Sequence, residues 1–299
     1  MKDHQPDFIR EINSPLFNRV FYWYCLTLFR RRFRAVWLDD SAVRPSSRST
    51  LYLGNHNSWW DALVPLLINE RVLHQRARAL MDVEQLRKYP FFRRLGVFSI
   101  DREHPRRALD SMEYAAALLN STGRPPDDSR VKSEPEGSKH PMPASQSAHS
   151  DETANPDETA RPDKTVRPAQ TPQTSPPVGL WFYPEGKLVR PETPIKLEGG
   201  IKWLARKLDP ARTEIIPFAI HMHFMRSDKP ELFVRMGEAL DLRMFEMRGD
   251  PVRDETQADR IAIILRHLRD ATRRDSARFE EAGRPNGGFR LLLGRPTKS

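Results

Sequence analysis

A stretch of 57 residues in the middle of the chain constrains the fold most, because it has almost nothing to contribute to a hydrophobic core. Residues 121–177 contain 11 of the 26 prolines and no Leu, Ile, Phe, Trp or Tyr. Ordering the backbone costs about 1–2 kcal/mol per residue, which a segment without large apolar side chains cannot offset. We therefore predict a disordered Pro/Ser/Thr-rich insertion. The composition leaves open whether it links two domains or loops out of one.

The residues on both sides of this insertion alternate between strand and helix patterns. Strands are expected at 50–53, 78–81, 97–100, 179–183, 214–220 and 231–237, and helices at 61–73, 105–119, 199–208 and 256–281. This alternation predicts an α/β fold, a single domain whose central sheet is mostly parallel or mixed and is flanked by helices. The domain would consist of residues 50–120 and 178–283, preceded by a segment 1–49 and followed by a flexible tail 284–299.

The net charge of +9 is distributed unevenly and favours an anionic partner. The excess is +6 in residues 1–120, −2 in the insertion 121–177 and +5 in residues 178–299. A single cysteine, Cys25, excludes a disulfide framework and a cysteine-based zinc finger. No apolar run reaches the ~18 residues of a spanning helix, and no signal peptide is recognisable, so we expect a cytoplasmic protein.

An aromatic-rich helix is expected at the N-terminal side of the domain. Apolar residues recur at helical spacing from residue 15 to residue 29, and four arginines follow within residues 30–34. Such a helix suits the surface of an anionic bilayer, and we expect residues 1–49 to form an amphipathic, helical membrane-surface segment. The pattern is equally consistent with a helix that packs on the protein's own core and leaves its basic end in solvent.

Polar clusters follow three of the predicted strands, and they are the candidates for chemistry. They lie at residues 54–61, 101–103 and 184–187. Ligands of open α/β sheets bind beyond the carboxyl ends of the strands, so the three clusters are expected to converge on one pocket. Taken singly, each has a plainer interpretation as a structural histidine, a surface ion pair or an ordinary turn.

The first cluster contains His56 and Asp61 in a His-x4-Asp pattern. Five residues of regular helix turn about 500°, so the two side chains cannot share a helical face. They can meet if His56 lies in the turn after the strand and Asp61 in the first turn of the next helix. A carboxylate on one ring nitrogen would then fix the tautomer, and the other nitrogen could take a proton from a hydroxyl. Backbone amides near Asn57 and Ser58 are candidates to stabilise an oxyanion.

Four ordered blocks give the chain a resemblance to a known family. They are Asn55-His56 through Asp61, Gly96 through Arg102, Phe182 through Leu188, and Ile215-Ile216-Pro217. In this order they resemble the lysophospholipid/glycerophosphate acyltransferase family (PlsC-like, 1-acylglycerol-3-phosphate acyltransferases). Arg102 and Glu185 are 83 positions apart, which becomes 26 without the 57-residue insertion, a separation typical of that family.

The resemblance implies an enzyme of lipid metabolism that moves a fatty acyl group from acyl-CoA or acyl-carrier protein to a lipid hydroxyl. His56 would be the general base and Asp61 its partner. The expected substrate-binding residues are Asn55, Arg102, Glu185, Gly186 and Lys187. No permanently bound cofactor is implied. No metal site is expected either, because His221 and His223 have no nearby carboxylate or cysteine to complete a set.

The third block departs from the family pattern, and this keeps other functions open. The family has Thr and Arg after the glycine, whereas this chain has Lys187 and Leu188. Lysine lacks the bidentate fork with which arginine binds phosphate. A phosphate-free or glycosylated lipid acceptor is therefore one alternative, and a non-catalytic basic membrane-binding protein is another.

The expected partners follow from this interpretation. They are an anionic membrane surface, a lipid acceptor and, as one of the two donors, acyl-carrier protein. The protein would be peripheral on the inner face of the cell membrane. Nucleic acid is not expected, because no zinc finger, aromatic RNA-binding motif or helix-turn-helix is recognisable.

Overall fold

The computed structural model describes residues 8–44, 46–121, 176–197, 200–225, 227–245, 251–282 and 288–295. All of them belong to one compact unit that takes chain from both sides of residues 127–174. Most of the predicted insertion, residues 122–175, lies outside the described residues.

One sheet of eight strands forms the centre of this unit. The strands are β1 (Ala35–Asp39), β2 (Ser49–Gly54), β3 (Arg76–Asp82), β4 (Val97–Ile100), β5 (Val178–Phe182), β6 (Thr213–His223), β7 (Glu231–Met236) and β8 (Arg290–Gly294), in the order β4-β3-β5-β2-β6-β7-β1-β8. The five strands from β4 to β6 are parallel. β7 and β1 run the other way, and the edge strand β8 is antiparallel to β1. The sheet is therefore mixed, as predicted.

The position of β5 shows how the two halves of the chain are combined. β5 follows the insertion in sequence, yet it pairs in parallel with β2 on one side and β3 on the other, two strands that precede the insertion. The flanks of residues 122–175 thus build one sheet, and the predicted single α/β domain is confirmed.

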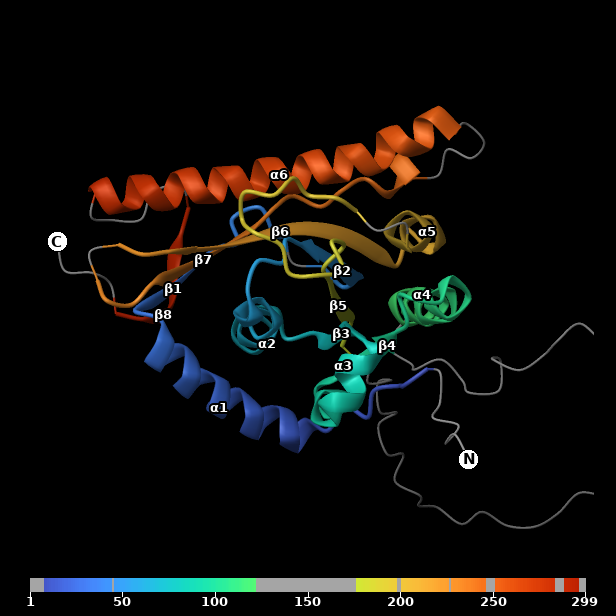
Figure 1. Ribbon diagram of the computed structural model, residues 1–299, viewed down its shortest axis with the longest axis horizontal. Coiled ribbons are helices and arrows are strands. Elements are labelled where there is room, and N and C mark those ends of the chain that lie inside the picture. The colour runs from blue at the N-terminus through green and yellow to red at the C-terminus, as the bar shows by residue number, and fades with distance from the viewer. Residues whose placement is uncertain are drawn as a thin grey trace, which may run out of the picture. The chain divides into compact units, whose positions relative to one another are not determined.

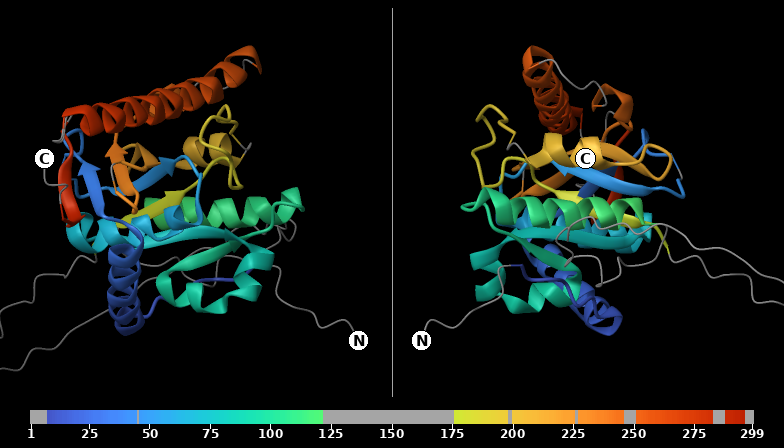
Figure 2. Two further views of the ribbon diagram at one scale, coloured as in Figure 1. Left: turned by 60° about the vertical axis from the view of Figure 1, so that its left-hand side comes forward. Right: turned by 90° about the vertical axis from the view of Figure 1, so that its right-hand side faces the viewer.

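Helices cover both faces of the sheet. They are α1 (Pro15–Arg32), α2 (Val64–Ile68), α3 (Val83–Lys88), α4 (Pro105–Asn120), α5 (Gly200–Lys207) and α6 (Pro251–Ala282), with shorter helical turns η1 (Trp59–Ala62), η2 (Asn69–Leu73), η3 (Pro90–Leu95) and η5 (Leu242–Phe245). Figures 1 and 2 show α6 and α1 on opposite sides of the strands. In β2, Leu51 and Leu53 join the core beneath α4, α5 and α6, whereas Tyr52 joins the core beneath α1 and α2. Both faces of the central strands are buried, as a continuous apolar run requires.

Capping residues set the starts of the helices α1 and α3. The Ser14 hydroxyl accepts from the backbone N–H of Phe17, and Pro15 occupies the first position of α1, where its missing N–H costs nothing. The Asp82 carboxylate, at the end of β3, accepts from the N–H groups of residues 84 and 85 and begins α3. Both starts are encoded by local sequence.

The single helix predicted over residues 61–73 is wrong in detail. The structure has the 3-10 turn η1, the short α2 and the π-helical turn η2 instead. Pro65 has no N–H to continue a hydrogen-bond ladder from η1, and His74 ends the segment at a φ of 52°.

The boundaries at the two ends of the chain also need correction. Residues 290–294, expected in a flexible tail, form β8, and residues 35–39, expected in a helical segment, form β1. β1 is buried along its whole length, and β8 covers its outer edge. Pairing with neighbouring strands, rather than local pattern, orders these short segments.

Within the described ranges, no helix combines the length and the apolar character that crossing a bilayer demands.

Candidate active site

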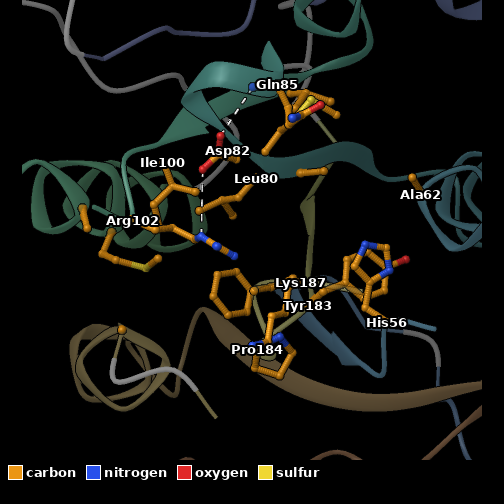
Figure 3. Close-up of a pocket in the computed structure, with 18 of the residues that line it drawn as sticks. His56, Ala62, Leu80, Asp82, Gln85, Ile100, Arg102, Tyr183, Pro184 and Lys187 are labelled. Carbon is orange, nitrogen blue, oxygen red and sulfur yellow. Dashed lines mark hydrogen bonds and ion pairs between the residues drawn. The ribbon is translucent and has the colours of Figure 1, made fainter. Parts of the chain in front are cut away.

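A cavity of about 770 Å³ opens at the carboxyl ends of the parallel strands β2 to β5. Its walls are mainly apolar, with contributions from β3, β4, η3, α4 and α5. The apolar lining includes Leu80, Phe92, Val97, Ile100, Leu109 and Met112. Four of the predicted site residues line it as well, namely Gly186 and the three labelled in Figure 3, His56, Arg102 and Lys187. Clusters far apart in sequence therefore converge at this end of the sheet, as predicted.

His56 lies in the turn after β2, and Asp61 lies in the following 3-10 turn η1. The Nδ1 atom of His56 is 3.4 Å from Oδ2 of Asp61. The His56 side chain is 20% exposed, whereas that of Asp61 is 1% exposed. The imidazole thus faces the cavity with a buried carboxylate behind it, in the arrangement that the spacing predicted. The catalytic role of the pair stays a prediction.

The Asp61 carboxylate also organises the turn that carries His56. Its Oδ2 accepts from the backbone N–H groups of Asn57 at 2.6 Å and Ser58 at 2.7 Å, and its Oδ1 accepts from the Ser58 hydroxyl at 2.7 Å. These two amides were expected to stabilise an oxyanion. That expectation is wrong, because the carboxylate already occupies them.

Tyr183, for which no role was predicted from the sequence, packs against both members of the pair. Its ring is stacked on the His56 imidazole, with centroids 4.4 Å apart and planes at 21°. Its hydroxyl donates to the main-chain oxygen of Asp61 at 2.5 Å. Burial, with a further contribution from the Asp61 carboxylate, raises the pKa of the Tyr183 phenol, which stays protonated. An aromatic residue directly after β5 is the one sequence signal that could have indicated it.

Glu185 supports the His56 turn from the opposite loop. Its Oε2 accepts from the backbone N–H of His56 at 2.9 Å, and the residue is 4% exposed. Burial raises the pKa of the Glu185 carboxyl, while the bond from His56 opposes that rise. Gly186 closes a turn by donating its N–H to Tyr183 and has a φ of +64°, which a side chain would strain. Glu185 is not among the cavity-lining residues, and its contact with an acceptor hydroxyl stays a prediction.

Asn55 joins β2 to its neighbour β6. Its side-chain amide donates to the main-chain oxygen of Ile220 at 3.0 Å and accepts from the N–H of the same residue at 2.8 Å. A further short contact links it to the Asn57 side chain. The residue is 1% exposed and is not part of the cavity lining. The structure therefore gives Asn55 a supporting position, and its predicted contact with substrate stays a prediction.

Two cations face the cavity from neighbouring loops. Arg102 follows β4 and Lys187 follows the turn after β5, and both line the cavity. The Arg102 side chain is 40% exposed and lies 3.9 Å from the carboxylate of Asp82, for which no role was predicted from the sequence (Figure 3). This end of the cavity suits an anionic or a hydroxyl-rich group next to an apolar chain.

Neither of two residues with nucleophilic chemistry is placed to form a covalent intermediate at His56. Burial raises the pKa of the Cys25 thiol to about 12, and the residue packs in the core under α1. The hydroxyl of Ser58 donates to Asp61. Neither side chain is therefore available as a nucleophile beside the imidazole.

His221 and His223 do not form a metal centre. His223 pairs with Glu280 at 3.0 Å, and burial lowers the pKa of His221 to about 4. Among the described residues, no group of three or more ligand-type side chains is arranged to hold a metal ion.

Comparison with known proteins adds a distant likeness. No family model and no curated protein matches the sequence. Among solved structures, the chain is similar to the 1-acyl-sn-glycerophosphate (LPA) acyltransferase PlsC from Thermotoga maritima, with 13% identity and a TM-score of 0.43. The match covers 85% of this chain and 78% of that chain. At these values the likeness decides neither family nor activity.

Proposed function

We propose that this protein is an acyltransferase that moves an acyl group from a thioester donor to a hydroxyl group of a lipid acceptor. The observation that carries the proposal is the His56 imidazole, backed by buried Asp61, at the surface of an apolar cavity of about 770 Å³. An apolar cavity of this kind suits an acyl chain, and a base at its wall suits proton transfer from an alcohol.

The reaction needs one base and no cofactor. The acceptor oxygen bonds to the thioester carbonyl carbon while its proton passes to the ring nitrogen of His56 that Asp61 does not hold. The carbon–sulfur bond then breaks, and the departing thiolate takes the proton from the imidazolium. The Asp61 carboxylate stabilises the imidazolium between these two transfers.

Arg102 and Lys187 are proposed to bind the anionic part of a substrate beside the acyl chain. Asp82 compensates part of the Arg102 charge, since the two lie 3.9 Å apart. This pairing keeps a phosphate-free or glycosylated acceptor as a second candidate, because such an acceptor needs hydroxyl contacts more than a full cationic site.

A panel of acceptors tests the reaction and separates the two candidates. Purified protein is supplied with acyl-CoA or acyl-carrier protein, and acyl transfer to lysophosphatidate or to a glycolipid is measured by mass spectrometry. A phosphate acceptor is supported if lysophosphatidate is acylated and its KM rises about 10-fold or more in Arg102→Ala. Transfer to the glycolipid alone supports the second candidate. Absence of transfer from either donor to any acceptor contradicts the proposed function.

We also propose that α1 lies on an anionic membrane surface, on the cytoplasmic side. Four large apolar side chains at helical spacing are 57–74% exposed along it, namely Leu16, Val20, Trp23 and Tyr24. Its last turn carries Arg30, Arg31 and Arg32. An apolar stripe that ends in cations matches the interface of an anionic bilayer.

Flotation with vesicles tests this docking. Wild-type protein is expected to float with vesicles that contain acidic phospholipids, and the double variant Leu16→Glu/Trp23→Glu is expected to lose most of that binding. Circular dichroism must show that the double variant is folded, because glutamate on the buried side of α1 would disrupt the core. Equal flotation of a folded variant contradicts the proposed surface.

A further inference from the structure

We propose that Tyr183 is a positioning residue that fixes the His56 imidazole for proton transfer. This inference rests on the acyltransferase function proposed above. It assigns a role to an aromatic side chain that contacts both members of the His56–Asp61 pair.

The first contact constrains the plane of the imidazole. The phenol ring lies 4.4 Å from the His56 ring at an angle of 21°, so the two rings are nearly parallel. Rotation of the imidazole about its Cβ–Cγ bond would break this stack. The same rotation would move Nδ1 away from Asp61, which it faces at 3.4 Å. The stack therefore favours the ring orientation that the proposed mechanism needs.

The second contact ties the phenol to the residue that carries the carboxylate. The Tyr183 hydroxyl donates to the main-chain oxygen of Asp61 at 2.5 Å. On its other edge the phenol packs against Phe218 of β6, with centroids 5.8 Å apart and planes at 72°. Tyr183 is thus held on two sides, and through it the imidazole is held at a fixed distance from the first turn of η1.

The charged groups around the imidazole do not replace this support. Asp61 contacts one edge of the ring, and Glu185 accepts from the backbone N–H of His56 rather than from its side chain. Lys187 and Arg102 line the same cavity. Of the interactions described for the His56 side chain, only the Tyr183 stack acts on a ring face.

A second stacked tyrosine provides a matched control. Tyr52 of β2 stacks on Trp181, with centroids 4.2 Å apart and planes at 19°, and its hydroxyl is bonded to Gln75 at 2.9 Å. It resembles Tyr183 in ring stacking and in its bonded hydroxyl, but it does not line the cavity. Tyr52→Phe is therefore expected to lose stability without losing catalysis.

The experiment compares Tyr183→Phe, Tyr183→Leu and Tyr52→Phe by kinetics, thermal unfolding and NMR. Tyr183→Phe keeps the ring stack on His56 and loses the hydrogen bond to the main-chain oxygen of Asp61, so kcat should fall about 2- to 10-fold. Tyr183→Leu loses both, so kcat should fall about 10- to 100-fold with a smaller change in KM. Tyr52→Phe should keep the wild-type kcat.

The NMR measurement is independent of activity. The Tyr183 ring current shifts the ring-proton resonances of His56, which are assigned by their absence in His56→Gln. These resonances should stay in place in Tyr183→Phe and move downfield in Tyr183→Leu.

The possible outcomes separate this inference from the proposed function. Unchanged His56 resonances in a folded Tyr183→Leu protein overturn the inference, and so does a wild-type kcat in that variant. If the wild-type protein shows no acyl transfer at all, the function fails, and the resonances alone still decide whether the Tyr183 ring is stacked on the imidazole. If kcat falls equally in Tyr183→Leu and in the control Tyr52→Phe, the fall reflects a general loss of stability, and this outcome also overturns the inference.

Discussion

Two histidine–aspartate pairs follow strands β2 and β4, which are separated in the sheet by β5 and β3, and of the two only the pair after β2 faces the cavity. His104 Nδ1 is 2.9 Å from Asp101 Oδ2, a closer contact than the 3.4 Å between His56 and Asp61. The His104 side chain is 59% exposed, however, whereas that of His56 is 20% exposed and lines the cavity. A short distance alone therefore does not identify a catalytic base. Water screens the exposed pair, and the apolar wall strengthens the electrostatics of the other.

The two carboxylates also have different neighbours. Asp101 accepts from the backbone N–H groups of Glu103 and His104 and lies 3.3 Å from Arg107. It thus shapes the turn before α4 and neutralises a surface cation. In the part of the chain that the structure describes, the hydrogen-bond donors to the Asp61 carboxylate come from residues 57 and 58 and from the imidazole, and none is a lysine or an arginine. Its charge is available to stabilise an imidazolium.

Removal of each imidazole gives the largest expected difference between the pairs. His56→Ala should lower kcat about 10²- to 10⁴-fold, because the proposed general base is gone. His104→Ala should keep the wild-type rate within about 2-fold, since surface substitutions away from a site have small effects. Rates of thiol release from acyl-CoA by the two folded variants check the comparison. Equal rates in both variants would remove His56 from the mechanism.

Neutralising each carboxylate is expected to have a smaller effect, on both kcat and stability for Asp61 and on stability alone for Asp101. Asp61→Asn places an amide NH₂ group near two backbone donors, so kcat should fall about 10- to 10²-fold and the free energy of unfolding should fall by about 1–3 kcal/mol. Asp101→Asn should lower the free energy of unfolding by about 1 kcal/mol and leave kcat unchanged. Urea denaturation and steady-state kinetics measure the two quantities. If Asp101→Asn lost as much activity as Asp61→Asn, the distinction between the pairs would not hold.

The smallest expected effect concerns Glu185, whose pKa is raised by burial. The folded protein then binds this proton more tightly than the unfolded chain does. This tighter binding contributes to the free energy of unfolding at a pH below about 4. The contribution is lost as the pH rises through the folded-state pKa, so the free energy of unfolding of the wild type should fall relative to that of Glu185→Gln. The substituted Gln side chain keeps an oxygen that can accept from the backbone N–H of His56, so the substitution removes the titrating group and leaves this hydrogen bond in place. Urea midpoints of both proteins at several pH values check this, and parallel stability curves would contradict it.

The sequence was informative where a local pattern and a strand end coincide. The strand at residues 97–100, the helix near residues 105–119 and the proximity of His56 to Asp61 were all predicted from spacing. Apolar runs and turn residues specify such elements locally, and the parallel arrangement of strands then brings their ends together.

Other features depend on partners that are distant in sequence. β8 is ordered by β1, more than 250 residues away, whereas the sequence alone led us to expect a flexible tail there. The orientation of Glu185 toward the backbone of His56, and the capture of two amides by Asp61, follow from the way two loops meet. Composition and periodicity carry no information about such contacts between loops, so these details could not be predicted.

The central place of β5 has a consequence for how the chain assembles during synthesis. β2 and β3 leave the ribosome early, yet they are not neighbours in the sheet, and the strand that joins them follows the 57-residue interruption. The pocket walls therefore cannot close until late in translation, and this high contact order favours slow folding. It also means that two separately expressed fragments, divided between residues 122 and 175, would have to associate through β5 and through the pairings of β6 with β2 and of β7 and β8 with β1. Recovery of activity on mixing such fragments would show that the covalent connection is dispensable.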